Sequence, residues 1–420
     1  MRVFLARTAI VWTLFLVAAG AASAQSGAGA QRALQKALNT GIKAAAGATG
    51  AYVVDLTTGQ TLFATGASTP RMPASVEKLY TTATALLRFG SNGTLTTNVA
   101  GSGSIDAGGT WHGTLYLKGG GDPTFGSASF DRYAYGTGAT MQRLVANLVR
   151  QTGLTAVQGR IAGDEAYFDS ERGTSATGGQ ASTYIEGLLS GLAYDRGLAN
   201  EQGTAFQTRP ALFAAQQFAS ALRAAGVKVP KQTPVVTAVT PTGAQPLTSV
   251  HSPRMATLIR LTNAPSDNYL AEMLLKGVGA HFGAGGTTAA GAAVVRSQVL
   301  QAFGIRPRIL DGSGLSRSDR TSARDMVTTL RAMAANPDFV NSLSVAGETG
   351  TLQLGLQGTA AQGRCRGKTG TLHDVANEVG YCTARDGHTL AFAFLMNAVD
   401  PTLGHSMEDQ MTVALAKYSG

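Results

Sequence analysis

Ser75 and Lys78 are the residues whose types and spacing most directly suggest chemistry. Three positions apart on a helix, their side chains share one face and come close enough to meet. A lysine amine placed in this way could act as the base that activates a serine nucleophile. The chain has nine lysines, and only Lys78 has a serine three residues before it. Because such a pair also arises by chance, its meaning depends on partners elsewhere in the chain.

Two later triplets offer such partners. Ser-Asp-Asn at 266–268 places a hydroxyl and an amide at the head of a predicted helix, although this triplet alone is better explained as a helix N-cap. Lys-Thr-Gly at 368–370, followed by Thr371, puts a cation, a hydroxyl and a glycine on a predicted strand, where glycine lets another backbone approach. A surface strand ending in a turn explains that triplet equally well. The similar run at 349–352 is preceded by Glu348 instead of lysine.

Apolar periodicity predicts the helix that would position the first pair. Pro70 and Pro73 end any preceding strand, and a buried stripe then recurs at helical spacing up to Gly90, a typical stop. We expect this helix to begin at about Ser75. The N–H groups of its first turn would then point outward beside the serine and favour negative charge there.

The other elements predict one sheet that is built from both ends of the chain. A hairpin is expected at 52–63 and three antiparallel strands at 363–372, 379–384 and 389–396, with helices between the two groups. Residues 92–249 differ, because short predicted strands there alternate with glycine-rich turns. We expect this stretch to form a separate, inserted α+β module.

The first 24 residues predict a targeting signal. Arg2 and Arg7 precede an apolar run over 9–17, and small residues form a cleavage site that ends at Ala24. An uncleaved membrane anchor is the alternative, but the apolar run is too short to span a bilayer comfortably. We therefore expect an exported chain, soluble or peripherally attached, with no transmembrane anchor after signal cleavage.

Composition narrows the classes of partner and cofactor. Two of the 34 basic residues lie in the signal, which leaves 32 against 25 acidic residues. This balance could favour anionic polymers of a cell envelope, although an arginine-rich proteome explains it equally well. No basic run is interleaved with aromatic residues, so nucleic acid is not an expected partner. The six histidines are scattered without a zinc-binding pattern, so neither a metal nor another cofactor is expected.

Together, the three triplets carry much more information than any one of them. Their order, S-x-x-K, S-D-N and K-T-G, is that of penicillin-binding proteins and serine β-lactamases. The chain resembles the D-alanyl-D-alanine carboxypeptidase/endopeptidase family, that is, the DacB-type (peptidase S13) low-molecular-weight class C penicillin-binding proteins. The long gap between Lys78 and Ser266 is similar to the inserted domain of that family, whereas β-lactamases have a short gap. Stretches 119–124, 311–317 and 346–352 also resemble the family.

The resemblance implies an α+β fold. A β-lactamase/transpeptidase-like domain, in which helices flank an antiparallel sheet, would comprise residues 25–91 and 250–420, with 92–249 inserted. The implied activity is that of a serine-type D-Ala-D-Ala carboxypeptidase, with endopeptidase activity left open. Its substrates would be peptidoglycan stem peptides ending in D-Ala-D-Ala, and β-lactam antibiotics would be covalent inhibitors. The enzyme would be periplasmic or extracellular and associated with the cell wall.

The family's catalytic roles then fall on matching residues. Ser75 would be the nucleophile that forms the acyl-enzyme, and Lys78 its base. Lys78 must then be neutral, so its pKa would be lowered by burial and by the charge of Lys368. The N–H groups of Ser75 and Thr371 would form the oxyanion hole. Ser266, assisted by Lys368, would pass a proton to the leaving amine.

Substrate binding would use the later motifs. Asn268 would orient the amide of the substrate, while Lys368 and Thr369 would hold its terminal carboxylate. Gly370 and Thr371 complete this substrate-binding strand.

The two cysteines are consistent with an exported protein. If the strands around them form a hairpin that turns near residues 373–374, Cys365 and Cys382 lie opposite each other, near enough for a disulfide. That bond would brace the strand carrying Lys368. Two reduced, buried cysteines are the alternative.

Three other functions compete with the carboxypeptidase. A β-lactamase or esterase on the same scaffold is disfavoured by the size of the insert. A conventional α/β-hydrolase is disfavoured because this sequence has no Gly-x-Ser-x-Gly motif at a strand-to-helix turn. A catalytically inactive wall-binding protein is disfavoured because all three triplets are intact.

Overall fold

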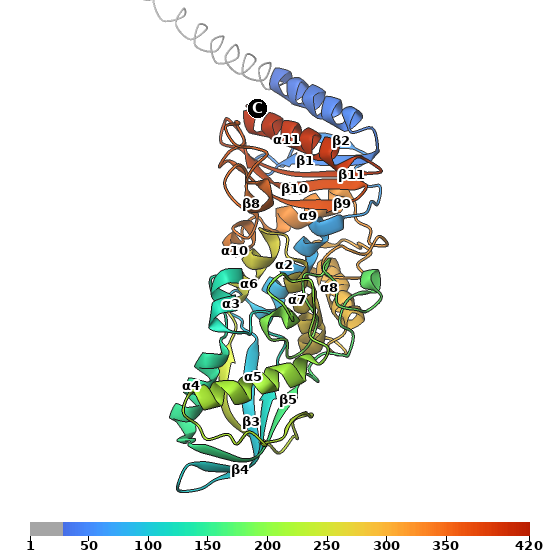
Figure 1. Cartoon of the computed structure of the whole chain (residues 1–420). Helices are drawn as coiled ribbons and strands as arrows, with labels where there is room; N and C mark the ends of the chain where they lie inside the picture. Colours follow the sequence, from blue (N-terminus) through green and yellow to red (C-terminus); the bar gives the residue numbers. More distant parts are fainter. Residues whose placement is uncertain (1–27) are drawn as a thin grey trace, which may run out of the picture. The chain divides into compact units, whose positions relative to one another are not determined.

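The computed structural model describes residues 28–420, so the predicted signal peptide lies outside the described residues (Figure 1). The chain forms two compact units. Among the described residues, unit 1 combines 28–71 with Ser322–Arg331 and Val345–Gly420. Unit 2 comprises Met72–Thr321 and Ala332–Ser344.

An antiparallel sheet forms the centre of unit 1. Its strand order is β2-β1-β11-β10-β9-β8, and β1 pairs with β11, so that the predicted sheet built from both ends of the chain is confirmed. The bounds are Ala48–Asp55 for β1, Thr61–Thr65 for β2, Ser344–Val345 for β8, Cys365–Leu372 for β9, Val375–Thr383 for β10 and Thr389–Asn397 for β11.

Helices cover this sheet and create the core of unit 1. The helix at 28–44 and α11 (Pro401–Lys417) contribute Leu34, Leu38 and Leu415 to one cluster with Phe392 and Phe394 of β11. Strands β10 and β11 are buried almost throughout. The sequence of β11 is accordingly a nearly continuous apolar run, whereas β10 also buries the polar residues Asn377 and Glu378. The α+β fold class is confirmed by this arrangement.

Packed helices form one part of unit 2. These are α2 (Lys78–Phe89), α6 (Met255–Asn263), α7 (Asn268–Phe282), α8 (Thr288–Phe303) and the short α10 (Pro337–Val340). Helix α7 is buried on almost every side, and its mostly apolar sequence reflects this, although Glu272 and Lys276 are buried with it. Helix α9 (Ala323–Met333) lies where the chain passes from unit 1 back to unit 2.

The other part of unit 2 is a mixed five-stranded sheet in the order β6-β5-β4-β3-β7. The strand bounds are Thr96–Ile105 for β3, Thr110–Lys118 for β4, Ala156–Asp164 for β5, Val235–Thr237 for β6 and Gln245–His251 for β7. Strand β3 pairs antiparallel with β4 and β7, whereas β4–β5 and β5–β6 are parallel. The same part of unit 2 contains three helices, α3 (Ala128–Ala134), α4 (Met141–Thr152) and α5 (Pro210–Ala224). The domain boundaries drawn from the sequence stay a prediction.

Candidate active site

Lys78 is the centre of the candidate site in unit 2. Its side chain is completely buried. Its Nζ lies 2.8 Å from Ser75 Oγ, 2.5 Å from Asn268 Oδ1 and 2.9 Å from the main-chain oxygen of Ser313. Three acceptors match the three donors of an ammonium group. When the amine is neutral, the Ser75 hydroxyl can instead donate to the nitrogen lone pair, which is the direction that base catalysis requires.

The surroundings of Lys78 favour its neutral form. Burial lowers its pKa to about 8, and the nearby carboxyl groups of Glu272 and Asp311 oppose this shift without cancelling it. A lysine with this pKa is a usable base near neutral pH, whereas an ordinary lysine is almost entirely protonated there. Burial was predicted as one cause of the shift, and the additional effect of Lys368 stays a prediction.

Ser75 lies on a tight turn that precedes the α-helix. The turn is the 3₁₀ segment η1 (Ala74–Glu77), which runs directly into α2 at Lys78, so the helical start predicted at about Ser75 is a 3₁₀ turn and not α-helix. Two backbone features explain the tightening: Pro73 precedes the turn, and Ala74 has a φ of +47°. The first N–H groups of such a turn have no partner within the helix, which leaves them available to a ligand.

The loop at 311–316 brings an acceptor to Lys78, and sequence reasoning gave this loop no role. Glu272 Oε1 accepts hydrogen bonds from the N–H groups of Gly312 at 3.0 Å and Ser313 at 2.8 Å. The Ser313 oxygen that contacts Lys78 belongs to the next peptide, whose N–H group on Gly314 donates to Asp311 Oδ1 at 2.8 Å. At Gly314, with φ of +81°, a Cβ atom would lie 1.8 Å from the Ala74 oxygen, so only glycine fits there.

Four buried carboxyl groups surround this loop and the base of α2. They belong to Glu77, Glu272, Asp311 and Asp319. Burial raises the pKa of Glu272 to about 8 and that of Asp319 to about 9, and it raises the pKa of Glu77 well above its usual range. Some of these groups therefore hold protons at neutral pH, so that Lys78 does not face four full negative charges.

Ser266 occupies a strained turn between α6 and α7. Its φ is +67°, a conformation that residues other than glycine adopt rarely and that is common at functional sites. The following residue, Asp267, is the N-cap of α7 and accepts from Leu270 N at 2.8 Å. It also pairs with Arg196. The N-cap interpretation of this triplet therefore applies to Asp267.

Asn268 has its amide orientation fixed by two partners. Its Nδ2 donates to the main-chain oxygen of Tyr184 at 2.7 Å, and a carbonyl can only accept. Its Oδ1 must therefore face Lys78. Tyr184 belongs to a segment without regular structure, where no element and no functional residue were predicted.

The K-T-G residues lie on β9 in unit 1. Lys368 is buried, and its Nζ donates to the Thr369 oxygen at 2.8 Å. Thr369 Oγ1 donates to Thr351 Oγ1 at 2.8 Å, and Gly370 is paired with Asn377 of β10. The roles assigned to this strand in substrate binding stay predictions.

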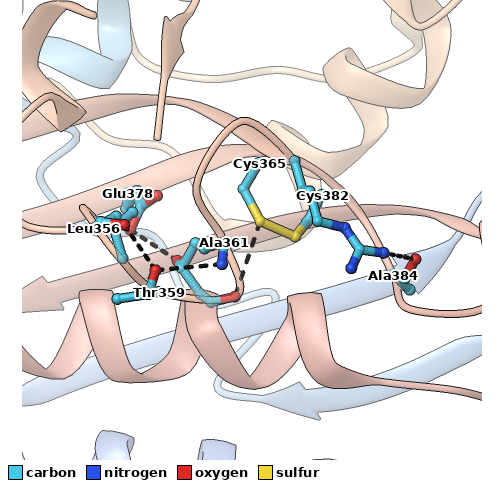
Figure 2. The surroundings of a disulfide bond; sticks show 9 residues. Leu356, Thr359, Ala361, Cys365, Glu378, Cys382 and Ala384 are labelled. Carbon is cyan, nitrogen blue, oxygen red and sulfur yellow. Dashed lines mark hydrogen bonds between the residues drawn. A yellow bond between two sulfur atoms is a disulfide. The ribbon is translucent and has the colours of Figure 1, made fainter. Parts of the chain in front are cut away.

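A disulfide joins β9 to β10 within unit 1. Cys365 and Cys382 are direct partners in the strand register, with their Cα atoms 4.0 Å apart, and both side chains are fully buried. Figure 2 shows the bond beside the turn that leads into β9, where Cys365 N donates to Ala361 O at 3.0 Å. The bond lies at the start of the strand that carries Lys368.

The described residues, 28–420, contain neither a metal-binding cluster nor a helix that could span a membrane. In that part of the chain, no three side chains of His, Cys, Asp or Glu are grouped so that they could hold a metal ion. None of the helices described there has the length and apolar character needed to cross a bilayer.

Comparison with known proteins matches almost the whole described chain to one family. The D-Ala-D-Ala carboxypeptidase 3 (S13) family matches residues 30–177 and 176–418. Carboxypeptidase DacB of Mycolicibacterium smegmatis is 30% identical over 386 residues, which cover 86% of this chain and 79% of that protein. A D-alanyl-D-alanine carboxypeptidase of Actinomadura sp. is 28% identical, with 88% and 81% covered.

A solved structure has the same fold. Penicillin-binding protein 4 (dacB) of Haemophilus influenzae has a TM-score of 0.72 at 20% identity, over 88% of this chain and 96% of that one. The same protein has also been solved in complex with a β-lactam, with a TM-score of 0.70 at 19% identity and coverage of 89% and 97%. From the sequence match and the arrangement of Ser75 and Lys78, the chain belongs to the D-Ala-D-Ala carboxypeptidase 3 (S13) family.

Proposed function

We propose that this protein is a serine-type D-Ala-D-Ala carboxypeptidase that hydrolyses peptidoglycan stem peptides through an acyl-enzyme on Ser75. The observation that carries this proposal is the 2.8 Å contact between Ser75 Oγ and the buried amine of Lys78. Membership of the S13 family and relatives named as carboxypeptidases support the same activity.

Acylation begins when Ser75 Oγ attacks the carbonyl carbon between the two D-alanines. Its proton passes to the neutral Nζ of Lys78, and the carbonyl oxygen becomes an oxyanion. The N–H groups of Ser75 and Thr371 would stabilise that oxyanion. Collapse of the intermediate breaks the C–N bond and leaves the penultimate D-alanine as an ester on Ser75.

The leaving D-alanine needs a proton on its amine. Ser266 would donate its hydroxyl proton and recover one from protonated Lys78, assisted by Lys368. This relay returns Lys78 to its neutral form. Water then attacks the ester carbon and gives a proton to Lys78. The bond between that carbon and Ser75 Oγ breaks, Lys78 returns the proton to Oγ, and the shortened peptide is released.

The other motif residues would hold the substrate in place. Asn268, whose amide is fixed by Lys78 and Tyr184, would bind the substrate amide next to the scissile bond. Lys368 and Thr369 would hold the terminal carboxylate, for which a lysine provides the opposite charge.

The site of action and the inhibitors follow from the same proposal. Stem peptides lie outside the cytoplasm, so we propose export with cleavage after Ala24, to a periplasmic or extracellular, cell-wall-associated position. β-Lactams would acylate Ser75 in place of the peptide. The β-lactam complex of the Haemophilus influenzae protein supports this inhibitor class.

Labelling with a fluorescent penicillin tests the nucleophile. Wild-type protein should label covalently and Ser75→Ala should not, while Ser104→Ala, which removes an exposed hydroxyl from β3, should label like wild type. Equal labelling of the wild type and Ser75→Ala would exclude Ser75 as the nucleophile. If no variant labels and no D-alanine is released from a pentapeptide, the wall-binding scaffold becomes the better explanation.

Product analysis separates the two peptidase activities. Release of D-alanine from a pentapeptide measures carboxypeptidase activity, and cleavage of cross-linked peptide dimers measures endopeptidase activity. Both should be lost together in Ser75→Ala, because one acyl-enzyme serves both reactions.

A further inference from the structure

A histidine and a buried carboxyl group lie behind the end of β9. His405 Nε2 is 2.8 Å from Thr371 Oγ1, and His405 Nδ1 is 2.7 Å from Glu408 Oε2. Thr371 is exposed, His405 is about one-third exposed at its side chain, and Glu408 is buried. The three groups thus form a chain of hydrogen bonds from the surface of the strand into the core of unit 1.

We propose that His405 and Glu408 are positioning residues that make the Thr371 hydroxyl a hydrogen-bond donor toward the substrate. This inference rests on the proposed function, in which Thr371 lies on the substrate-binding strand. An anionic carboxylate or oxyanion accepts hydrogen bonds, so a hydroxyl beside it must donate.

The direction of the Thr371 hydroxyl depends on one proton. When the His405–Glu408 pair holds that proton, Nε2–H donates to Thr371 Oγ1, and the hydroxyl hydrogen is free to point outward. When the pair has lost it, Nδ1–H donates to Glu408 and Nε2 accepts the hydroxyl hydrogen of Thr371. The oxygen of Thr371 can then only accept, which repels an anionic ligand.

Buried carboxyl groups in unit 1 favour the form of the His405–Glu408 pair that holds this proton. Glu378 on β10 is also buried, its pKa is raised by burial and by Glu408, and one oxygen of each carboxyl group has no hydrogen-bond partner. Asp409 on α11 adds further negative charge. Burial lowers the pKa of His405 and raises that of Glu408, so the neutral form of the pair, with the proton on Glu408, is favoured.

Two further titratable groups lie in the turn that follows β9. His373 and Asp374 face each other there, with His373 Nε2 3.5 Å from Asp374 Oδ1. The position of His405 itself depends on close packing of α11 against the sheet. A Cβ atom at Gly404 would lie 2.4 Å from the Cβ of Ala376 on β10, so glycine allows this approach.

A second histidine–carboxyl pair in unit 1 provides a matched control. His388 Nδ1 lies 2.7 Å from Asp55 Oδ2, and Asp55 is buried. Here, the hydrogen bond raises the pKa of His388, and the pKa of Asp55 is lowered, as in an ordinary ion pair. This pair lies at the end of β1, away from Thr371 in the strand order.

The proton position can be measured without any assay of activity. In the full chain labelled with ¹⁵N-histidine, the His405 signal, assigned by its loss in His405→Phe, should show the Nε2–H tautomer at pH 7. His388 should show a protonated or Nδ1–H ring. An Nδ1–H tautomer of His405 at pH 7 would overturn the proposal, whatever the enzyme is found to hydrolyse.

Kinetics test the consequence for substrate binding. Thr371→Val should raise KM for a D-Ala-D-Ala peptide about tenfold at pH 7, with a much smaller change in kcat, as expected for one lost hydrogen bond to an anion. His405→Phe keeps the hydroxyl but removes the group that orients it, so it should raise KM by a smaller factor. Because Thr371→Val already deletes the hydroxyl that His405 orients, the double variant should be no worse than Thr371→Val. Thr371→Ser should restore KM, and His388→Phe should leave it unchanged.

Three kinetic results would count against the proposal. These are an additive double variant, a loss confined to kcat, or the same KM effect in His388→Phe. If Ser75 itself proves inactive, the tautomer measurement still decides the arrangement of the pair, so the two proposals fail separately.

Discussion

Adding a negative charge beside Lys78 should shift the pH dependence of acylation. Asn268→Asp is nearly isosteric and puts a carboxylate at the oxygen position 2.5 Å from Nζ. An opposite charge at that distance favours the ammonium form and raises a lysine pKa by roughly 1–3 units. The variant should therefore need a higher pH before Lys78 can accept the proton of Ser75.

The wild-type curve follows from the pKa of Lys78, which is about 8. About 9% of the amine is then neutral at pH 7, about half at pH 8 and about 90% at pH 9. The acylation rate should rise about tenfold between pH 6 and 7 and less than twofold above pH 9. In Asn268→Asp the midpoint should move to roughly pH 9–11, with a rate at pH 7 lower by about tenfold or more.

The assay is the second-order rate constant for acylation by a fluorescent penicillin between pH 6 and 11. The midpoint of the curve, and not its height, is the result, since Asn268 is also proposed to contact the ligand. Asn92→Asp adds the same charge at an exposed turn and should leave the midpoint in place, because solvent and salt screen it. A wild-type rate that is flat from pH 6 to 10, or an unmoved midpoint in Asn268→Asp, would refute Lys78 as the base.

Three further predictions concern the supports of the site. Glu272→Ala should slow acylation at least tenfold and lower the free energy of unfolding by about 1–3 kcal/mol, because two N–H groups in the loop of Ser313 lose their acceptor. Glu272→Gln keeps an acceptor oxygen, so its effect on the acylation rate should be smaller. An unchanged rate in the alanine variant would argue against this role. The unreduced, denatured protein should contain no free thiol, and two free thiols would exclude the bond between Cys365 and Cys382. Replacing both cysteines by serine should lower the free energy of unfolding, measured by denaturant titration, by about 3 kcal/mol. Burial raises the pKa of Glu378, so the folded state keeps a proton that the unfolded state releases above its ordinary pKa. The contribution of this group to the free energy of unfolding therefore falls as pH rises. Glu378→Gln should make that fall smaller in thermal melts from pH 5 to 9.

Local patterns predicted the strands and helices that carry the motifs. The closing strands were expected at 363–372, 379–384 and 389–396, close to the observed β9, β10 and β11. The helix expected from about Ser75 begins at Ala74, but its first turn is the 3₁₀ segment η1, and α2 itself starts at Lys78. Periodicity alone does not reveal that Ala74 adopts a positive φ against Gly314, which tightens the turn at Ser75.

The parallel pairings of β4 with β5 and of β5 with β6 were also not predicted. Short strands between glycine-rich turns give no information on direction, which depends on how the intervening helices return the chain. The segment containing Tyr184 has no regular element, and its contact with Asn268 could not be expected from composition.

The sequence by itself determined the chemistry that is available. The types and order of the three triplets indicate a serine nucleophile with an amine base, because few other groups at that spacing could serve, and the cysteines indicate a paired hairpin. Tertiary structure decided whether Lys78 can be a base. Its pKa depends on burial and on the carboxyl groups of Glu272 and Asp311, which are far from it in sequence. Its hydrogen-bond partners Asn268 and Ser313 are equally distant along the chain. Desolvation and hydrogen-bond geometry exist only once distant segments have packed, and no local pattern encodes them.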